Sequence, residues 1–125
     1  MSDKSERLRE INIENYVWII YIGIIFLSWY ANSKEKKFIL YDDLKSKEEY
    51  QNLMIIIFTI LLFIYYYFTK DSFYDVKSLN SGDTNKKKYL VYASFIGSTL
   101  ILISGIIFLV IVILDDNIDT EVAFN

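Results

Sequence analysis

Serines, tyrosine–aspartate pairs and an acidic tail are the groups in this sequence that could do chemistry. Ser94, Ser98 and Ser104 lie in one uncharged apolar segment. A serine hydroxyl becomes a nucleophile only beside a base such as histidine or lysine. The sequence contains no histidine and that segment contains no lysine, so serine catalysis is not expected.

The pairs Tyr41-Asp42 and Tyr74-Asp75 have the residue types of one half of an intramembrane aspartyl protease. Both aspartates lie outside the uncharged segments of the chain. The G-x-G-D half is also missing, because residues 81–83 read Ser-Gly-Asp without the first glycine. A Walker-type phosphate loop is likewise absent from the sequence. We therefore expect neither an enzyme nor a nucleotide site.

The C-terminal tail, residues 115–125, carries Asp115, Asp116, Asp119 and Glu121 without a basic residue. Calcium loops place oxygen ligands at fixed spacing around a turn glycine, and this tail has no such pattern. The chain has no cysteine for zinc or iron–sulfur ligation. No metal or cofactor is expected. A net charge of -3 also argues against nucleic acid as a partner.

The charged residues fall into four blocks, separated by three uncharged stretches at residues 15–33, 50–69 and 89–114. Each stretch, as a helix rising about 1.5 Å per residue, spans roughly the 30 Å hydrocarbon core of a bilayer. A chain of 125 residues is too small to bury three such helices in a soluble core. The sequence predicts an all-α, three-transmembrane-helix bundle in a single domain. Residues 15–33 resemble a signal-peptide apolar region, but Trp29 argues against a cleavage site after Ala31.

The segments that flank the spans predict longer helices with defined ends. The second span continues at helical spacing, which predicts a helix over about residues 43–79 capped by Asp42 or Asp43. Gly82 is expected to end it in the left-handed conformation, with Asp83 or Thr84 capping the third helix. The second and third helices then form a hairpin. The apolar residues 38–41 are expected to anchor at the interface or pack on the bundle, with a short strand as the alternative.

Basic residues predict the orientation of the hairpin. Eight Lys and Arg residues lie on the side of the N-terminus and the second loop, and five lie on the other side. The basic side of a membrane protein faces the cytoplasm, so the N-terminus and the hairpin turn are expected there, with the C-terminus outside. The second loop holds a basic cluster for which topology anchoring is the simple explanation and lipid-headgroup binding the alternative: Lys86, Lys87 and Lys88.

Aromatic residues gather at the ends of the spans, where amphipathic rings settle at headgroup depth. This belt is expected to anchor the helices rather than to stack on a ligand. Its members are Tyr16, Trp18, Trp29, Tyr30, Tyr65, Tyr66, Tyr67, Tyr89 and Tyr92.

Small residues are concentrated in the third span, and small residues let membrane helices approach closely. The third helix is therefore expected to be the packing centre. Its small face would pack against the first two helices or, alternatively, against a second copy or a membrane-protein partner. The face comprises Ala93, Ser94, Gly97, Ser98, Ser104 and Gly105.

The whole chain resembles small, uncharacterised multi-pass membrane proteins of low-GC Gram-positive bacteria, in residues 11–16 (INIENY), 103–108 (ISGIIF) and 121–125 (EVAFN). The resemblance implies a bacterial inner-membrane location and no activity. Together with the missing catalytic groups, it favours a non-catalytic protein that acts through helix–helix interaction, such as an accessory subunit, modulator or immunity-type protein. A small holin-like pore former is the alternative. Transport is disfavoured because the spans lack ionisable groups.

Overall fold

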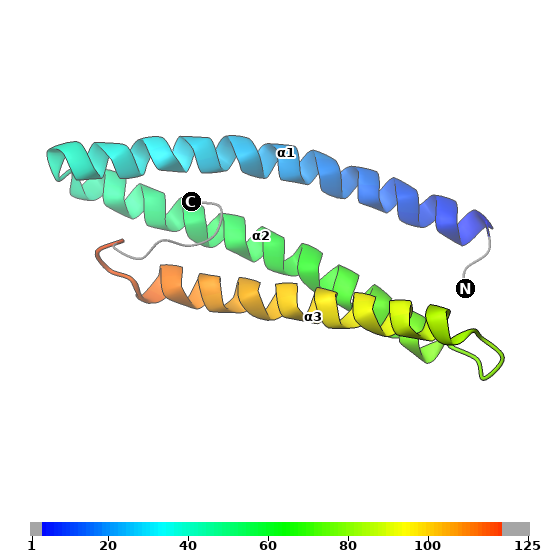
Figure 1. Ribbon diagram of the computed structural model, residues 1–125. Helices are drawn as coiled ribbons and strands as arrows, with labels where there is room; N and C mark the ends of the chain where they lie inside the picture. The colour runs from blue at the N-terminus through cyan, green and yellow to red at the C-terminus, as the bar shows by residue number, and fades with distance from the viewer. Residues whose placement is uncertain (1–3, 119–125) are drawn as a thin grey trace.

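Three long helices make up the computed structural model, which describes residues 4–118 (Figure 1). They are α1 (Lys4–Tyr41), α2 (Leu44–Lys77) and α3 (Asn85–Leu114), and no strand occurs among the described residues. Each helix contains an apolar stretch long enough to cross a membrane. The all-helical fold and its three apolar helices are thus confirmed.

α2 is the central helix of the structure. The chain reverses twice, and α2 packs against both α1 and α3, whereas no Cα atom of α1 lies within 8 Å of a Cα atom of α3 in residues 4–118. The prediction that the third helix is the packing centre is therefore wrong. Small residues permit close approach, but the largest side chains that are almost fully buried all belong to α2, namely Met54, Ile57 and Phe58.

α1 is one uninterrupted helix, longer than a bilayer requires. It contains no proline, and its only glycine, Gly23, is accommodated inside the helix. Residues 38–41 form its last turn, so the strand alternative is excluded. The helix ends where Asp42 adopts a left-handed φ of 52° while its amide donates to the Phe38 carbonyl at 2.8 Å.

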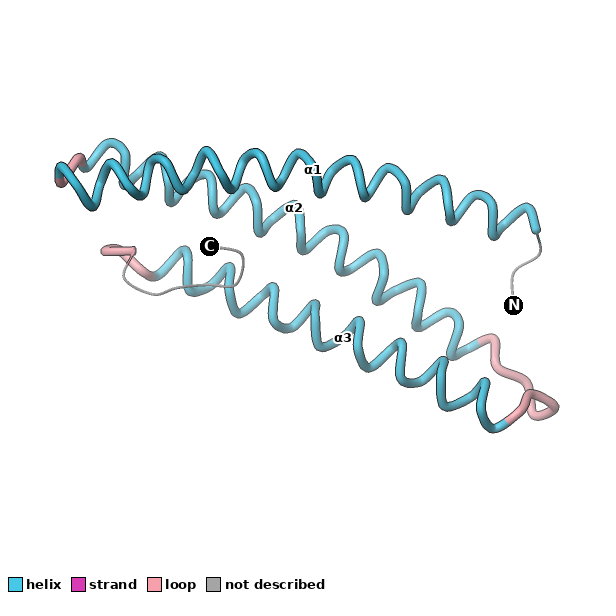
Figure 2. Tube along the Cα trace, turned by 45° about the horizontal axis from the view of Figure 1, so that its top comes forward, coloured by secondary structure: helices cyan, strands magenta, loops and turns pink. Residues whose placement is uncertain are grey.

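The side chains of α1 that face α2 recur at alternating spacings of four and three residues. This average period of 3.5 is typical of two helices whose axes run nearly parallel along their contact. Val17, Ile24 and Ala31 are the buried members of this seam. Because the helices are antiparallel, the first turns of α1 lie opposite the last turns of α2. Figures 1 and 2 both show the two helices diverging toward the N-terminal end of α1.

α2 begins as predicted and ends slightly earlier than predicted. Asp43 is its N-cap, accepting a hydrogen bond from the Lys45 amide at 3.2 Å. Its last helical residue is Lys77, and the amide of Ser78 then donates to carbonyls of the last turn.

The α2–α3 turn is closed by an aspartate rather than by a glycine. Gly82 does not have a positive φ, so the predicted left-handed glycine is wrong. Instead, Asp83 accepts a hydrogen bond from the Asn80 amide at 2.8 Å through its carboxylate. Thr84 then caps α3 by accepting from the Lys87 amide at 3.2 Å, as one of the two predicted caps.

Candidate functional site

The small residues of α3 divide into two groups around the helix. Successive residues turn by about 100°, so Ser94, Ser98 and Gly105 share one side. Ala93, Gly97 and Ser104 fall together about 100° away. Only the first group lies on the side of α3 that packs against α2, and Gly105 is its buried member.

The α2-facing group makes close and partly polar contacts. A Cβ atom added at Gly105 would lie 2.9 Å from Cδ2 of Leu62 and 3.1 Å from the Tyr65 ring, so only glycine fits without displacement. About two helical turns before Gly105, the hydroxyl of Thr69 donates to the Ser98 carbonyl at 3.0 Å. The hydroxyls of Ser72 and Ser98 lie 3.2 Å apart.

A further hydrogen bond joins the opposite end of the α2–α3 pair. The side-chain amide of Gln51 donates to the Val112 carbonyl at 3.0 Å. Hydrogen bonds between helices replace those that water supplies outside the membrane, so α2 and α3 are fixed at both ends. Sequence reasoning did not identify Gln51, Thr69 or Ser72, although polar residues at the ends of an apolar span were the available signal.

The second group of α3 is open. Ala93, Gly97 and Ser104 are exposed, and no atom lies within 4 Å of a Cβ built at Gly97. We call these three residues the outer stripe of α3. The close approach that small residues permit is used by this chain only on the α2-facing side, and the outer stripe is not covered by any described residue.

A groove of about 680 Å³ runs between α1 and α2. We call it the α1–α2 groove. Its walls are mostly apolar, with four polar side chains among them. Its lining residues are Tyr21, Ile24, Ile25, Ser28, Trp29, Asn32, Leu61 and Tyr65. Ser28 and Asn32 thus place an uncharged hydroxyl and an amide inside the first predicted span, where hydrocarbon offers no hydrogen bonds.

A smaller and more polar cavity of about 330 Å³, toward the α2–α3 turn, is lined by residues of all three helices. α1 contributes Glu14, α2 contributes Asp71 and Asp75, and α3 contributes Ser94 and Ser98. Burial raises the pKa of Asp71, and the neighbouring carboxylates of Glu10, Asp75 and Glu14 raise it further. Sequence reasoning did not single out these acids because they come from separate blocks of charge.

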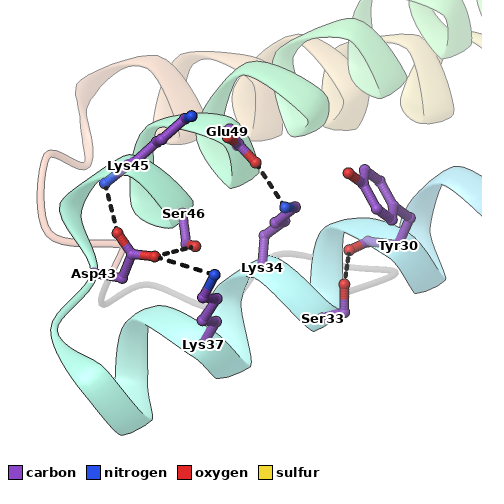
Figure 3. Close-up of polar contacts among 8 residues, drawn as sticks. All are labelled: Tyr30, Ser33, Lys34, Lys37, Asp43, Lys45, Ser46 and Glu49. Atoms are coloured by element: carbon purple, nitrogen blue, oxygen red, sulfur yellow. Dashed lines mark hydrogen bonds and ion pairs between the residues drawn. The ribbon is translucent and has the colours of Figure 1, made fainter.

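The turn between α1 and α2 carries charges of opposite sign instead (Figure 3). The Lys34 ammonium lies 2.8 Å from the Glu49 carboxylate, and Lys37 lies 3.5 Å from Asp43. Lys34 lowers the pKa of Glu49, chiefly through their hydrogen bond. The Asp43 pKa is also lowered, first by the hydrogen bond from the Ser46 hydroxyl at 2.9 Å.

Most of the predicted aromatic belt is exposed, including Tyr16, Trp18, Trp29, Tyr30, Tyr66, Tyr89 and Tyr92. Tyr65 is the clearest exception. It lies between helices, lining both cavities and contacting the Gly105 position. The spacing of aromatic residues could not separate this interhelical tyrosine from its neighbours Tyr66 and Tyr67.

The basic cluster follows the α3 cap. Lys87 pairs with the Asp83 carboxylate at 3.1 Å, while Lys86 is exposed and Lys88 half-buried. The Asn80 amide and Lys87 together lower the pKa of Asp83. In the acidic tail, Asp115 caps the end of α3 through its amide, which donates to the Ile111 carbonyl. Asp119 and Glu121 lie outside the described residues.

The contacts that the small and polar residues of α2 and α3 make within residues 4–118 are packing contacts and hydrogen bonds. No group of three acidic side chains in that range converges closely enough to hold a metal ion. Of the serines that were considered as nucleophiles, Ser98 has its hydroxyl beside that of Ser72, and its main-chain carbonyl accepts from the Thr69 hydroxyl. Comparisons of the chain with protein-family models, with curated proteins and with solved structures find no match.

Proposed function

We propose that this chain is a non-catalytic integral membrane protein that acts through helix–helix interaction, as an accessory subunit, modulator or immunity-type protein of another membrane protein. The observation that carries the proposal is how little of its apolar surface the chain covers itself. In the most apolar 18-residue stretch of each helix, the share of residues that are buried is 11% in α1, 28% in α2 and 11% in α3.

Lipid alone satisfies most of this surface, but two features favour a protein partner. The outer stripe of α3 is open to close approach by another backbone. The α1–α2 groove holds Ser28 and Asn32, and membrane helices with such side chains associate by hydrogen bonds across helices. A partner helix with small or hydroxyl-bearing residues fits both surfaces, and so does a second copy of this chain.

The proposed orientation places the N-terminus and the α2–α3 turn in the cytoplasm of a bacterial cell, with the C-terminus outside the inner membrane. It rests on the excess of basic residues on that side. A reporter fused after Asn125 is expected to be active only outside the cytoplasm. If that fusion is active in the cytoplasm, the proposed orientation is wrong and the C-terminus lies inside.

Purification of the tagged chain in mild detergent tests the interaction. We expect a defined partner or homo-oligomer to copurify with the parent chain and to be lost from Gly97→Leu, whose new side chain blocks the outer stripe. A monomer without partner from the parent chain, or an undiminished complex from Gly97→Leu, would contradict a partner at this stripe. Abrupt permeabilisation of cells on induced expression would favour the pore-forming alternative instead.

A further inference from the structure

The α1–α2 groove has the length of one membrane leaflet. Its α1 wall runs from Tyr21 to Asn32, which is about 17 Å at the helical rise of about 1.5 Å per residue. Half of the hydrocarbon core of a bilayer measures about 15 Å. Tyr21 lies near the middle of the first predicted span, residues 15–33, and Asn32 lies at its end, which we call the outer end of the groove. The groove thus matches one acyl chain in length, and its 680 Å³ fall within the range of about 300–1,000 Å³ for sites that take one ligand.

Two polar side chains in the groove lack hydrogen-bond partners in the chain. Other hydroxyls of these helices donate to a carbonyl of their own helix, as Ser33 does to the Tyr30 carbonyl at 2.6 Å. Within residues 4–118, neither the Ser28 hydroxyl nor the Asn32 amide makes a hydrogen bond of its side chain. A polar group without a partner is costly at hydrocarbon depth. A molecule that fills the groove is therefore favoured if it offers oxygen acceptors near the outer end.

A lysine follows the groove at the depth of the lipid head groups. Lys36 lies one helical turn beyond Asn32, about 6 Å farther along the helix axis. The headgroup region of a bilayer is of this thickness, about 5–7 Å on each side. Because successive residues turn by about 100°, Lys36 falls between Asn32 and Trp29 around α1, on the side of the groove. It is exposed and makes no ion pair in the part of the chain that the structure describes.

The neighbouring lysines of α1 are engaged elsewhere. Lys34 and Lys37 lie on the other flank of the helix, where they pair with Glu49 and Asp43 of the turn and of α2 (Figure 3). Lys36 is therefore the lysine of this segment that an anion at the outer end of the groove can reach without breaking an ion pair.

Negative charge lies on the inner side of the same outer end. Glu35 is half-buried and turned toward α2, where it interacts with the Tyr50 hydroxyl. Asp115, at the end of α3, acts on the same tyrosine. The outer end thus combines a cation at its rim with carboxylates on its inner side. A purely anionic head group is repelled by these carboxylates, whereas a zwitterion is complementary to both signs of charge.

We propose that the α1–α2 groove binds one phospholipid with a zwitterionic phosphoethanolamine head group. One acyl chain lies along the apolar walls, and its ester oxygens accept hydrogen bonds from Ser28 and Asn32. The phosphate pairs with Lys36, and the ammonium lies toward Glu35. Apolar walls, uncharged donors and charges follow one another along α1 in the order in which chain, ester and head group follow one another along the membrane normal.

The lipid site rests on the membrane location in the proposed function, but it does not require a protein partner. A partner helix that enters the α1–α2 groove has to displace this lipid. A partner at the outer stripe of α3 does not, because the stripe lies on another helix. The lipid therefore competes at one of the two proposed partner surfaces and leaves the other open.

Native mass spectrometry of the full chain tests the site. The chain is purified in mild detergent and incubated with equal amounts of phosphatidylethanolamine, phosphatidylglycerol and phosphatidylcholine that carry the same acyl chains. We expect each chain to retain one molecule of phosphatidylethanolamine in preference to the other two, because phosphatidylglycerol lacks the ammonium and phosphatidylcholine lacks its N–H donors. Retention of no lipid, or equal retention of all three, overturns the proposal.

Single charge removals test the head-group contacts. Lys36→Gln and Glu35→Gln should each lower the retention of phosphatidylethanolamine about fivefold, the equivalent of about 1 kcal/mol for one charge at the lipid surface. Lys45→Gln and Glu48→Gln remove the same charges from exposed positions on the side of α2 away from Leu61, and they should retain the lipid as the parent chain does. Retention equal to that of the parent in Lys36→Gln or Glu35→Gln overturns the proposal.

A matched pair of aromatic substitutions tests the groove itself. Ser28→Phe fills the groove and removes a donor, so the lipid should be lost. Ile22→Phe adds a ring at an exposed position of α1 outside the groove and should retain it. If Ser28→Phe does not fold, Asn32→Leu at an exposed position decides, with an expected loss of about fivefold for one hydrogen bond. Full retention in the variant that decides overturns the proposal.

The same spectra separate a lipid from a second copy of the chain. A dimer that carries no lipid and that Ser28→Phe dissociates would assign the groove to a second copy and overturn the proposal. The measurement uses the isolated chain, so a negative result leaves the copurification test of the proposed function unaffected.

Discussion

Replacement of Gly105 by leucine should weaken the α2–α3 contact, whereas the same replacement at Gly97 should not. The two glycines lie on one helix and both are achiral helix residues within the predicted third span. They differ in what surrounds them. At Gly105 a Cβ would lie 2.9 Å from Leu62 and 3.1 and 3.3 Å from two ring atoms of Tyr65, whereas at Gly97 nothing lies within 4 Å.

The magnitude follows from what must move. Leucine at position 105 adds three carbons beyond a Cβ that would itself already lie closer to Leu62 than van der Waals distance. Overpacking of a buried site costs about 1–3 kcal/mol. The Leu62 side chain can rotate, and the Tyr65 ring borders the α1–α2 groove, so both can yield in part. We therefore expect a destabilisation of about 1–2 kcal/mol, in the lower part of that range.

For the same substitution at Gly97 we expect no loss of stability. Leucine is a better helix former than glycine by at most about 1 kcal/mol, and the open surroundings impose no penalty. The free energy of unfolding should therefore be unchanged or slightly higher. Gly97→Leu thus combines normal stability with the loss of any partner that uses the outer stripe.

Reversible unfolding of both variants in mixed micelles, with increasing denaturing detergent and helix content followed by circular dichroism, measures these differences. The parent chain and Gly23→Leu, another glycine without neighbours within 4 Å, serve as references. If Gly105→Leu unfolds at the same detergent fraction as the parent, or Gly97→Leu is equally destabilised, the assignment of the two glycines to different surfaces is refuted.

Two further predictions concern the helix ends. Thr84→Ala removes the acceptor of the Lys87 amide and should destabilise the first turn of α3 by about 1 kcal/mol, seen as faster amide hydrogen exchange there, while Thr84→Ser should restore protection. Lys34 lowers the pKa of Glu49, so the stability from this ion pair is present above the ordinary glutamate pKa and is lost as the pH falls through the lowered pKa. Thermal unfolding of Lys34→Met, measured against pH, should lack this acid-induced loss. If the pH profile of that variant equals that of the parent chain, the ion pair is not the source of the loss.

The sequence predicted the course of the chain because charge and capping are local signals. Charge-free stretches locate the three apolar helices, and short side chains such as Asp43 and Thr84 accept the hydrogen bonds of helix starts wherever they precede one. The prediction of a left-handed residue at Gly82 was wrong because it relied on residue type alone. Glycine is the residue most often found there, but Asp42 adopts that conformation in this chain and Gly82 does not.

The sequence could not predict which helix faces pack together. In a membrane helix, lipid-facing and protein-facing side chains are equally apolar, so hydrophobic periodicity does not separate them. Gly97 and Gly105 look equivalent in the sequence, yet one is open and the other fits against Leu62 and Tyr65. The central position of α2 likewise depends on the shape of large side chains, among them Phe58.

The backbones of α1 and α3 stay apart, since no Cα atom of one lies within 8 Å of a Cα atom of the other in residues 4–118, and each outer helix rests on α2. A substitution that remodels one outer helix therefore reaches the other through α2 or through the polar cavity that all three helices line. The sequences of α1 and α3 can thus diverge largely independently, as long as each keeps its own seam with α2.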